Sequence, residues 1–246
     1  MKYRLSFSAV LRIAFIFFVS SFILLPSGCS SGSGKKENPY DLNIVSSLKE
    51  YRHSIATDSS NMLVDLEDHI PGIILDIRYA GTNNFTNTTI YTLPKAYLRR
   101  PAADSLLKIQ QLLSKMNLGI KVFDAYRPYA ATLYFYEVCG DTTFVAAPWK
   151  GSIHNRGCAV DLTLVDLSTG EELQMPTAFD EFSTAASHNY MELDSTKLAN
   201  RALLLKVMTE NGFTMYEYEW WHYNIKGRDK YSLMDISFEE LEKLKK

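Results

Sequence analysis

The chain lacks an excess of charge of either sign, and this absence excludes one class of partner. Lysine and arginine together number 26, against 28 aspartates and glutamates, so the formal net charge is −2. Proteins that hold nucleic acid need a basic surface to neutralise phosphates, and the sequence contains no basic stripe. We therefore expect no nucleic-acid partner.

Long apolar segments are also lacking. The marked apolar run, residues 13–25, is too short to span a bilayer comfortably. It follows Lys2, Arg4 and Arg12 and leads to Ser27-Gly28-Cys29, which is the pattern of a secretory signal. The end of this segment resembles the processing site of bacterial lipoproteins, with Cys29 as the lipidated first residue. A plain signal peptide is the alternative interpretation.

These features predict the organisation of the chain. Residues 1–28 are expected to form a lipoprotein-type signal peptide, residues 29–38 a flexible tether rich in serine and glycine, and residues 39–246 a single domain. The mature protein would then be extracytoplasmic: a periplasmic or surface lipoprotein that is anchored to a bacterial membrane only through Cys29.

Cysteine is scarce, with three residues in the chain. Apart from Cys29 there are Cys139 and Cys158, which we expect to be two buried free thiols, although their pairing stays open at this point. A nucleophilic Cys158 with His154 as its base is a weaker alternative, because nothing else around it resembles a cysteine hydrolase.

Helical and strand patterns alternate along the domain. Apolar residues at helical spacing predict helices at 39–51, 101–116, 130–139 and 196–210, with a charged amphipathic helix at 237–246. Strands are expected at 72–79, 120–123, 159–167 and 213–218, and a hairpin-type turn at 168–170. The order of these elements favours an α+β fold with a mainly antiparallel central sheet flanked by helices.

One motif carries a candidate metal site. In GSIHNRGCAVDLTL, residues 151–164, His154 and Asp161 stand seven residues apart across a turn at Arg156-Gly157. Asp161 lies in an apolar run, where a carboxylate is costly to bury unless it is paired or bound to metal. An ion pair with Arg156 is the alternative. A catalytic zinc site needs a third protein ligand, and His222 near the far end of the chain is the candidate.

Glu219 stands three residues before His222 and is the candidate general base. A base that acts on metal-bound water must lie close to the metal without occupying it. On a regular strand, residues three apart face opposite sides. We therefore expect that the chain bends at Trp220-Trp221, or that Glu219 still lies in a turn when His222 enters a strand.

Arg127 lies on a Tyr-Arg-Pro turn at the end of a predicted strand. Its permanent charge and forked geometry suit the stabilisation of a developing oxyanion, and Asp124 could hold it in place. A surface salt bridge between these two residues is an equally weighted alternative.

Six motifs occur in the order of a known family, from about residue 63 to about residue 231. They are DIRYAGTNNF (76–85), FDAYRP (123–128), SIHNRGCAVDLTL (152–164), MPTAFDEF (175–182), Ser187-His188 and EWWHY (219–223). Together they resemble the D-alanyl-D-alanine dipeptidase family, which comprises zinc peptidases of the wider DD-carboxypeptidase and hedgehog-like fold group.

The resemblance implies a role for each matching residue. It implies one zinc ion per chain, held by His154, Asp161 and His222, with Glu219 as general base and acid and Arg127 on the tetrahedral intermediate. It also implies that Tyr79 and Asp180 receive the free ammonium group of the substrate and that Ser152 makes a polar contact in the same pocket. The chain departs from the family pattern at Cys158 and at Pro176, and the second departure bears on how Asp180 is presented.

The expected function follows from these roles. It is the zinc-dependent hydrolysis of D-Ala-D-Ala, or of closely related small D-amino-acid dipeptides, by metal-activated water in cell-wall peptide turnover. The alternatives are a same-fold peptidoglycan carboxypeptidase or endopeptidase that acts on longer stems, and a non-catalytic zinc domain that binds wall peptides. Glu219 and Arg127 argue against the last, because binding alone needs neither a base nor an oxyanion partner.

Overall fold

The computed structural model describes residues 38–245, which belong to one compact unit, Lys36–Lys246. The predicted signal peptide and residues 29–37 of the predicted tether, Cys29 among them, lie outside the described residues. Between residues 38 and 245, no helix has both the length and the apolar character needed to cross a membrane.

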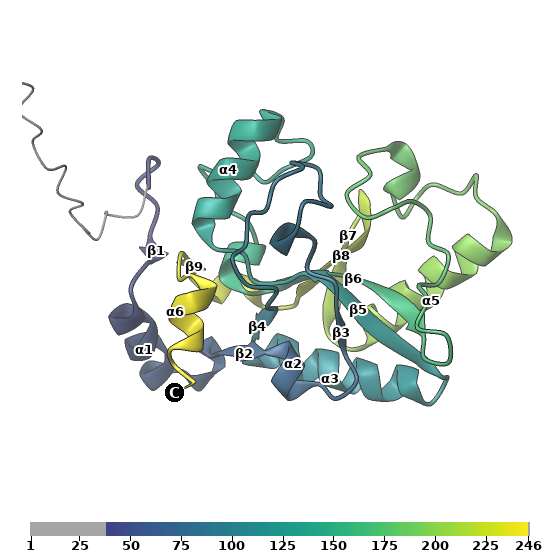
Figure 1. The fold of residues 1–246 in the computed structure, drawn as a ribbon, viewed down its shortest axis with the longest axis horizontal. Helices are drawn as coiled ribbons and strands as arrows, with labels where there is room; N and C mark the ends of the chain where they lie inside the picture. The colour runs from purple at the N-terminus through teal and green to yellow at the C-terminus, as the bar shows by residue number, and fades with distance from the viewer. Residues whose placement is uncertain (1–37, 246) are drawn as a thin grey trace, which may run out of the picture. The chain divides into compact units, whose positions relative to one another are not determined.

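A five-stranded sheet forms the centre of the unit (Figure 1), in the order β3-β5-β6-β8-β7. Its strands are β3 (Ile74–Leu75), β5 (Leu118–Asp124), β6 (Ala159–Asp166), β7 (Phe213–Tyr216) and β8 (Glu219–Ile225). β3 pairs with β5 in parallel, and the other three pairs are antiparallel. The predicted α+β fold with a mainly antiparallel sheet is therefore confirmed.

Two strand pairs and six helices complete the described part of the chain. β1 (Ile44–Val45) pairs in parallel with β9 (Leu233–Met234), and β2 (Leu63–Asp65) pairs antiparallel with β4 (Tyr97–Arg99). The helices are α1 (Leu48–Thr57), α2 (Leu66–His69), α3 (Arg100–Ser114), α4 (Tyr129–Cys139), α5 (Ser195–Glu210) and α6 (Phe238–Glu242). In Figure 1, α4 stands above the sheet and α3 runs below it.

Three predicted elements have the wrong bounds, and one of them, the helix expected at 237–246, covers only α6 (Phe238–Glu242). The helix expected at 39–51 begins only after Ser47, because the Ser47 side chain accepts the N–H of Glu50 and the Glu50 carboxylate accepts the N–H of Ser47. This capping box fixes the start of α1, and the residues before it pair as β1. The strand expected at 72–79 covers only two residues, since the chain then turns into η2 (Arg78–Ala80).

Gly157 fixes the turn that leads into β6. Its φ is +67°, and a Cβ built there would lie 2.5 Å from Leu63 Cδ2. Only glycine combines this left-handed backbone with the absence of a side chain. The predicted turn at Arg156-Gly157 is therefore confirmed, and it sets the position of His154 relative to the sheet.

Candidate metal centre and active site

Three neighbouring strands place two carboxylates and an imidazole in one row. Asp124 on β5 lies opposite Asp161 on β6, and Asp161 lies opposite His222 on β8. Residues directly opposite one another on adjacent strands point to the same face, with Cβ atoms about 5 Å apart. The register of the sheet therefore gathers residues that lie far apart in the sequence.

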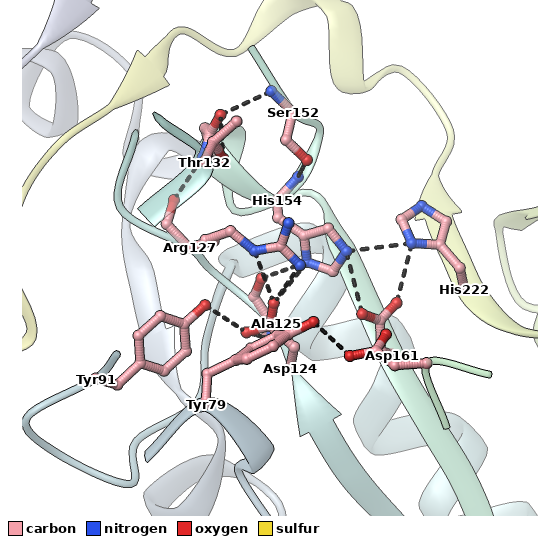
Figure 2. A network of polar contacts seen from close by, with 12 residues as sticks. Tyr79, Tyr91, Asp124, Ala125, Arg127, Thr132, Ser152, His154, Asp161 and His222 are labelled. Carbon is pink, nitrogen blue, oxygen red and sulfur yellow. Dashed lines mark hydrogen bonds and ion pairs between the residues drawn. The ribbon is translucent and has the colours of Figure 1, made fainter. Parts of the chain in front are cut away.

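His154 joins this row from the 3-10 turn η3 (His154–Arg156) that precedes β6. Its Nε2 lies 3.4 Å from Asp161 Oδ2 and 3.1 Å from His222 Nδ1. His222 Nδ1 lies 2.9 Å from Asp161 Oδ1. Figure 2 shows the three side chains pointing toward one another, and one ligand atom from each lies within 4.8 Å of the others.

The outer nitrogens of both imidazoles are held by oxygen acceptors. His154 Nδ1 donates to the carbonyl oxygen of Ala125 at 2.7 Å, and His222 Nε2 donates to Asn224 Oδ1 at 3.0 Å. Each ring therefore turns the lone pair of its other nitrogen inward, as metal-bound histidines do. Two lone pairs and a carboxylate then converge on one point, an arrangement that a divalent cation stabilises, and the N,N,O donor set suits zinc.

Asp161 pairs with these two histidines and not with Arg156. Burial raises the pKa of Asp161, but the charges and hydrogen bonds of His154 and His222 outweigh burial and bring that pKa below its ordinary value. The side chain of Arg156 instead donates to the carbonyl oxygen of Tyr231. The alternative ion pair between Asp161 and Arg156 does not form.

Glu219 stands beside the cluster of three without belonging to it. Its Oε2 lies 3.8 Å from His222 Nδ1, and its side chain is 20% exposed. Burial raises the pKa of Glu219 to about 7. A carboxyl group with a pKa near neutrality can both accept and return a proton, which is the behaviour expected of the predicted base.

A bulge in β8 brings Glu219 and His222 to the same pocket. Met215 pairs with Tyr223, whereas the next residue of β7, Tyr216, pairs with Glu219. The residues between Glu219 and Tyr223 therefore have no partners on β7. They form a bulge, and a bulge bends the strand. Of the two sequence-based expectations, the bend at the tryptophans matches the backbone, since Glu219 is already the first residue of β8.

The two tryptophans of this bulge are buried. Trp221 is 1% exposed and lines the pocket, while Trp220 Nε1 donates to Thr177 Oγ1 at 3.0 Å. The indole of Trp221 therefore forms an apolar wall beside Glu219, and an apolar wall strengthens local electrostatic interactions.

Arg127 is held by Asp124, and the pair is buried. Arg127 Nε and Nη2 donate to the same oxygen, Asp124 Oδ2, at 3.0 and 2.7 Å. The other oxygen, Oδ1, accepts from the Tyr91 hydroxyl and from the backbone N–H of Ala125, both at 2.9 Å. Arg127 is 7% exposed, so this is no surface salt bridge. Asp124 fixes the guanidinium in one orientation at the pocket.

Tyr79 and Asp180 meet at another wall of the pocket. The Tyr79 hydroxyl donates to Asp180 Oδ2 at 2.7 Å. Asp180 adopts a φ of +58°, a left-handed conformation that is uncommon outside glycine. Burial raises the pKa of its carboxyl well above the ordinary value. A cation that enters the pocket would favour the charged form of Asp180 and be held by it.

One pocket of about 350 Å³ contains every residue that the sequence singled out for catalysis or binding. Its walls include Tyr79, Arg127, Ser152, His154, Asp161, Asp180, Glu219 and His222. The Ser152 hydroxyl accepts the backbone N–H of His154 at 3.2 Å, so it also orders the turn that presents this histidine. The structure brings all eight residues together, while their individual roles stay predictions.

Sequence reasoning missed several polar residues in or beside this pocket, among them Asn224 and Arg228, which line it, and Tyr91, which donates to Asp124. Asn224 could have been found, because it stands two residues after His222 and a strand places both on one face. Tyr91 follows a loop, and Arg228 lies in a charged turn, so neither carried a distinguishing signal.

The cysteine nucleophile is not supported. Cys158 is fully buried, and burial raises the pKa of its thiol to about 12, whereas a reactive thiol needs a lowered pKa. Cys139 and Cys158 are both free. Cys139 is partly exposed, so the expectation that it is buried is wrong.

Comparisons with known proteins agree with the resemblance noted from the motifs. Residues 59–240 match the D-ala-D-ala dipeptidase family. The chain is 32% identical over 176 residues to the D-alanyl-D-alanine dipeptidase of Escherichia coli K12, a match that covers 72% of this chain and 91% of that protein. It is 29% identical over 181 residues to the D-alanyl-D-alanine dipeptidase of Enterococcus faecium, with coverage of 65% and 90%.

Proposed function

Because this chain belongs to the D-ala-D-ala dipeptidase family, we propose that it is a zinc-dependent peptidase that hydrolyses D-Ala-D-Ala or a closely related dipeptide. The observation that supports this proposal most is the position of Glu219, which lies 3.8 Å from His222 and outside the cluster of three possible metal ligands. A protein that only bound wall peptides would need no carboxyl group poised near neutral pH at this place.

The residues of the pocket divide the reaction among them. Zinc held by His154, Asp161 and His222 would supply a water of lowered pKa and a polarised carbonyl. Glu219 accepts the proton of the attacking water and then delivers it to the leaving amine. Arg127, fixed by Asp124, faces the carbonyl oxygen as negative charge develops on it.

Asp180 and Tyr79 account for the choice of a dipeptide. A free ammonium group at the first residue of the substrate would be received by the Asp180 carboxylate, next to the Tyr79 hydroxyl. A longer peptide offers an uncharged amide at that position, and its upstream chain would have to pass the Asp180 wall. The pocket should therefore favour substrates with a free amino terminus.

A panel of dipeptides tests this function. The metal-loaded full chain should hydrolyse D-Ala-D-Ala but neither L-Ala-L-Ala nor N-acetyl-D-Ala-D-Ala. A chelator should abolish the activity, and added zinc should restore it. Absence of hydrolysis by the metal-loaded protein, or hydrolysis that a chelator leaves unchanged, would contradict the proposal.

One observation favours a second candidate, a peptidase that acts on longer wall stems. A cavity of about 740 Å³ adjoins the catalytic pocket and shares Phe144, Phe182, Glu219 and Trp221 with it. A longer peptide could extend into this cavity. Mass spectrometry of the products from D-Ala-D-Ala and from an intact stem pentapeptide separates the two candidates.

We also propose that the mature protein works outside the cytoplasm, anchored by lipid at Cys29, and takes part in the salvage or turnover of wall fragments. The support is the sequence of residues 1–29 alone. An exported enzyme cannot reach a cytoplasmic pool of wall precursors, so antibiotic resistance is the less favoured role. Mass spectrometry of the mature N-terminus tests this location and the lipid at Cys29. An uncleaved chain in the cytosol would contradict the proposal.

A further inference from the structure

Arg228 is a cation of the catalytic pocket that the roles above leave unused. It opens the turn η5 (Arg228–Lys230), directly after Gly227, whose φ is +75°. Its side chain lines the same pocket as His222 and Glu219. Arg228 therefore brings a charged side chain to this pocket from the turn that follows β8.

Contacts along β7 and β8 place the guanidinium close to the cluster of possible metal ligands. Arg228 Nη1 lies 3.5 Å from Thr214 Oγ1, and Thr214 pairs with Asn224 across the two strands. Asn224 Oδ1 in turn accepts from His222 Nε2 at 3.0 Å. The guanidinium thus contacts Thr214, whose partner across the strands, Asn224, contacts His222.

The guanidinium of Arg228 has an unmet donor. Its Nε is buried and has no hydrogen-bond partner within the part of the chain that the structure describes. Arginine stays charged in proteins and cannot relieve an unpaired N–H by losing its proton. Buried donors are nearly always satisfied in native proteins, by protein atoms, by water or by a ligand, so this N–H is open to an acceptor from outside the chain.

Arg127, the other arginine of the pocket, offers a contrast. Two of its nitrogens donate to Asp124, so its charge is largely compensated by a protein carboxylate. Among residues 38–245, the guanidinium of Arg228 has only the long contact to the neutral hydroxyl of Thr214. Arg228 is therefore the cation in this pocket that is free to bind an anion.

We propose that Arg228 binds the C-terminal carboxylate of the dipeptide substrate. This inference rests on the proposed function and deepens it. A free dipeptide carries an ammonium group at one end and a carboxylate at the other, and Asp180 is suited only to the first. Arg228 is suited to the second, since a guanidinium and a carboxylate form a strong charge-assisted pair. Both ends of the substrate are then read, so the pocket selects a free carboxyl terminus as well as a free amino terminus.

Arg228→Gln tests the assignment when it is measured on two substrates, D-Ala-D-Ala and its C-terminal amide. The variant keeps a polar side chain, which is shorter than that of arginine and lacks the charge. We expect KM for the free acid to rise about 10- to 100-fold, which is the effect of losing one charged hydrogen bond, while kcat changes less than threefold. The amide lacks the carboxylate, so its kinetics should be nearly unchanged.

Lys226→Gln is the matched control, because Lys226 is an exposed cation in the same turn region. It should leave both substrates unaffected. A binding measurement in a variant without turnover completes the test. In metal-loaded Glu219→Gln, calorimetry measures the affinity for the free acid. Adding Arg228→Gln should weaken this affinity by a similar factor.

Each contrary result has a distinct meaning. Equal losses of the acid and the amide in Arg228→Gln would show a structural role and overturn the inference, and so would no loss on either. A wild-type protein that cleaves the acid and the amide equally well would overturn the inference but leave the proposed function standing. A metal-loaded wild type that cleaves neither substrate would overturn the proposed function and this inference with it.

Discussion

The catalytic pocket has a strand-held half and a loop-held half. Asp161 and His222 face each other across β6 and β8, and each has its hydrogen-bond partners within the protein. Asp180 and Arg228 come from turns, one with a positive φ and the other with an unpaired buried Nε. Sheet register leaves the first half little freedom, whereas loops vary readily. We therefore propose that the strand-held residues serve the chemistry, together with His154 and Arg127, and that Asp180 and Arg228 serve the choice of substrate.

Loss of a strand-held ligand should have the largest effect. We expect His222→Ala to lose the metal altogether and to lower activity to background, since two protein ligands do not make a catalytic zinc site. Elemental analysis of the purified variant measures the metal, and circular dichroism shows whether the fold is kept. A folded variant that keeps a full complement of metal would contradict the assignment of His222 as a metal ligand.

Glu219→Gln should come next, because it removes the base but no ligand. We expect kcat to fall by about 10²- to 10⁴-fold, the usual contribution of a general acid–base group, while the metal content stays the same. Glu217→Gln is the control, since Glu217 is an exposed carboxylate two residues away. Activity of Glu219→Gln within tenfold of wild type would refute the assignment of the base.

Asp180→Asn sharpens the comparison from the loop side. Asparagine tolerates a positive φ, so the loop should keep its shape while the charge is lost. We expect KM for D-Ala-D-Ala to rise about 10- to 100-fold with a smaller change in kcat, and the preference over the N-acetylated dipeptide to shrink. Steady-state kinetics on both substrates measures this, with Glu181→Gln as the exposed neighbouring control. A fall in kcat alone would place Asp180 with the chemistry instead.

Acid should have the smallest effect of the four changes. It should lower the stability of the fold through His188, which lies in a loop. His188, in the loop that precedes α5, is 8% exposed, and neither ring nitrogen has a partner within the described part of the chain. Burial, together with the nearby charge of Arg201, lowers the pKa of His188 from 6.5 to about 4. Tyr223 packs against the ring and supplies no negative charge near neutral pH.

The sign of this effect follows from the lowered pKa. The folded state favours neutral His188, so its contribution is complete above pH 6.5 and is lost as the pH falls from 6.5 toward 4. The free energy of unfolding should drop by up to about 3 kcal/mol over this range. Chemical denaturation at several pH values should show the drop in wild type and a smaller one in His188→Gln. His53→Gln, at an exposed position of α1, should behave as wild type. An equal drop in all three proteins would contradict the prediction.

Local patterns in the sequence predicted the long helices and the strands β5 and β6 well, because an apolar stripe has the period of its own element. The inner strand β8 (Glu219–Ile225) was not predicted as a strand of its own, since the expected final strand, 213–218, ended before it. α3, α4 and α5 each lie within two residues of the predicted bounds. The start of α1 was missed because the capping signal at Ser47 and Glu50 prevails over the apolar spacing before it. The sequence thus predicted the elements better than their ends.

The candidate site could be predicted in its residues but not in its geometry. Nothing local states that Asp161 lies opposite His222, because the register depends on the whole sheet. The bulge that turns Glu219 toward His222 could be stated only as one of two alternatives. Arg228 carried no signal at all, since a charged residue after glycine resembles any exposed turn until its surroundings are known.

The place of β8 in the sheet has a consequence for biosynthesis. β8 lies between β6 and β7 and carries both Glu219 and His222. His222 follows Asp161 by 61 positions, so the ribosome makes two of the three possible metal ligands, His154 and Asp161, long before the third. A nascent chain that still lacks β8 lacks both the third possible metal ligand, His222, and the proposed base, Glu219. Under the proposed function, hydrolytic competence therefore requires that β8, the last strand of the five-stranded sheet to be synthesised, has been inserted.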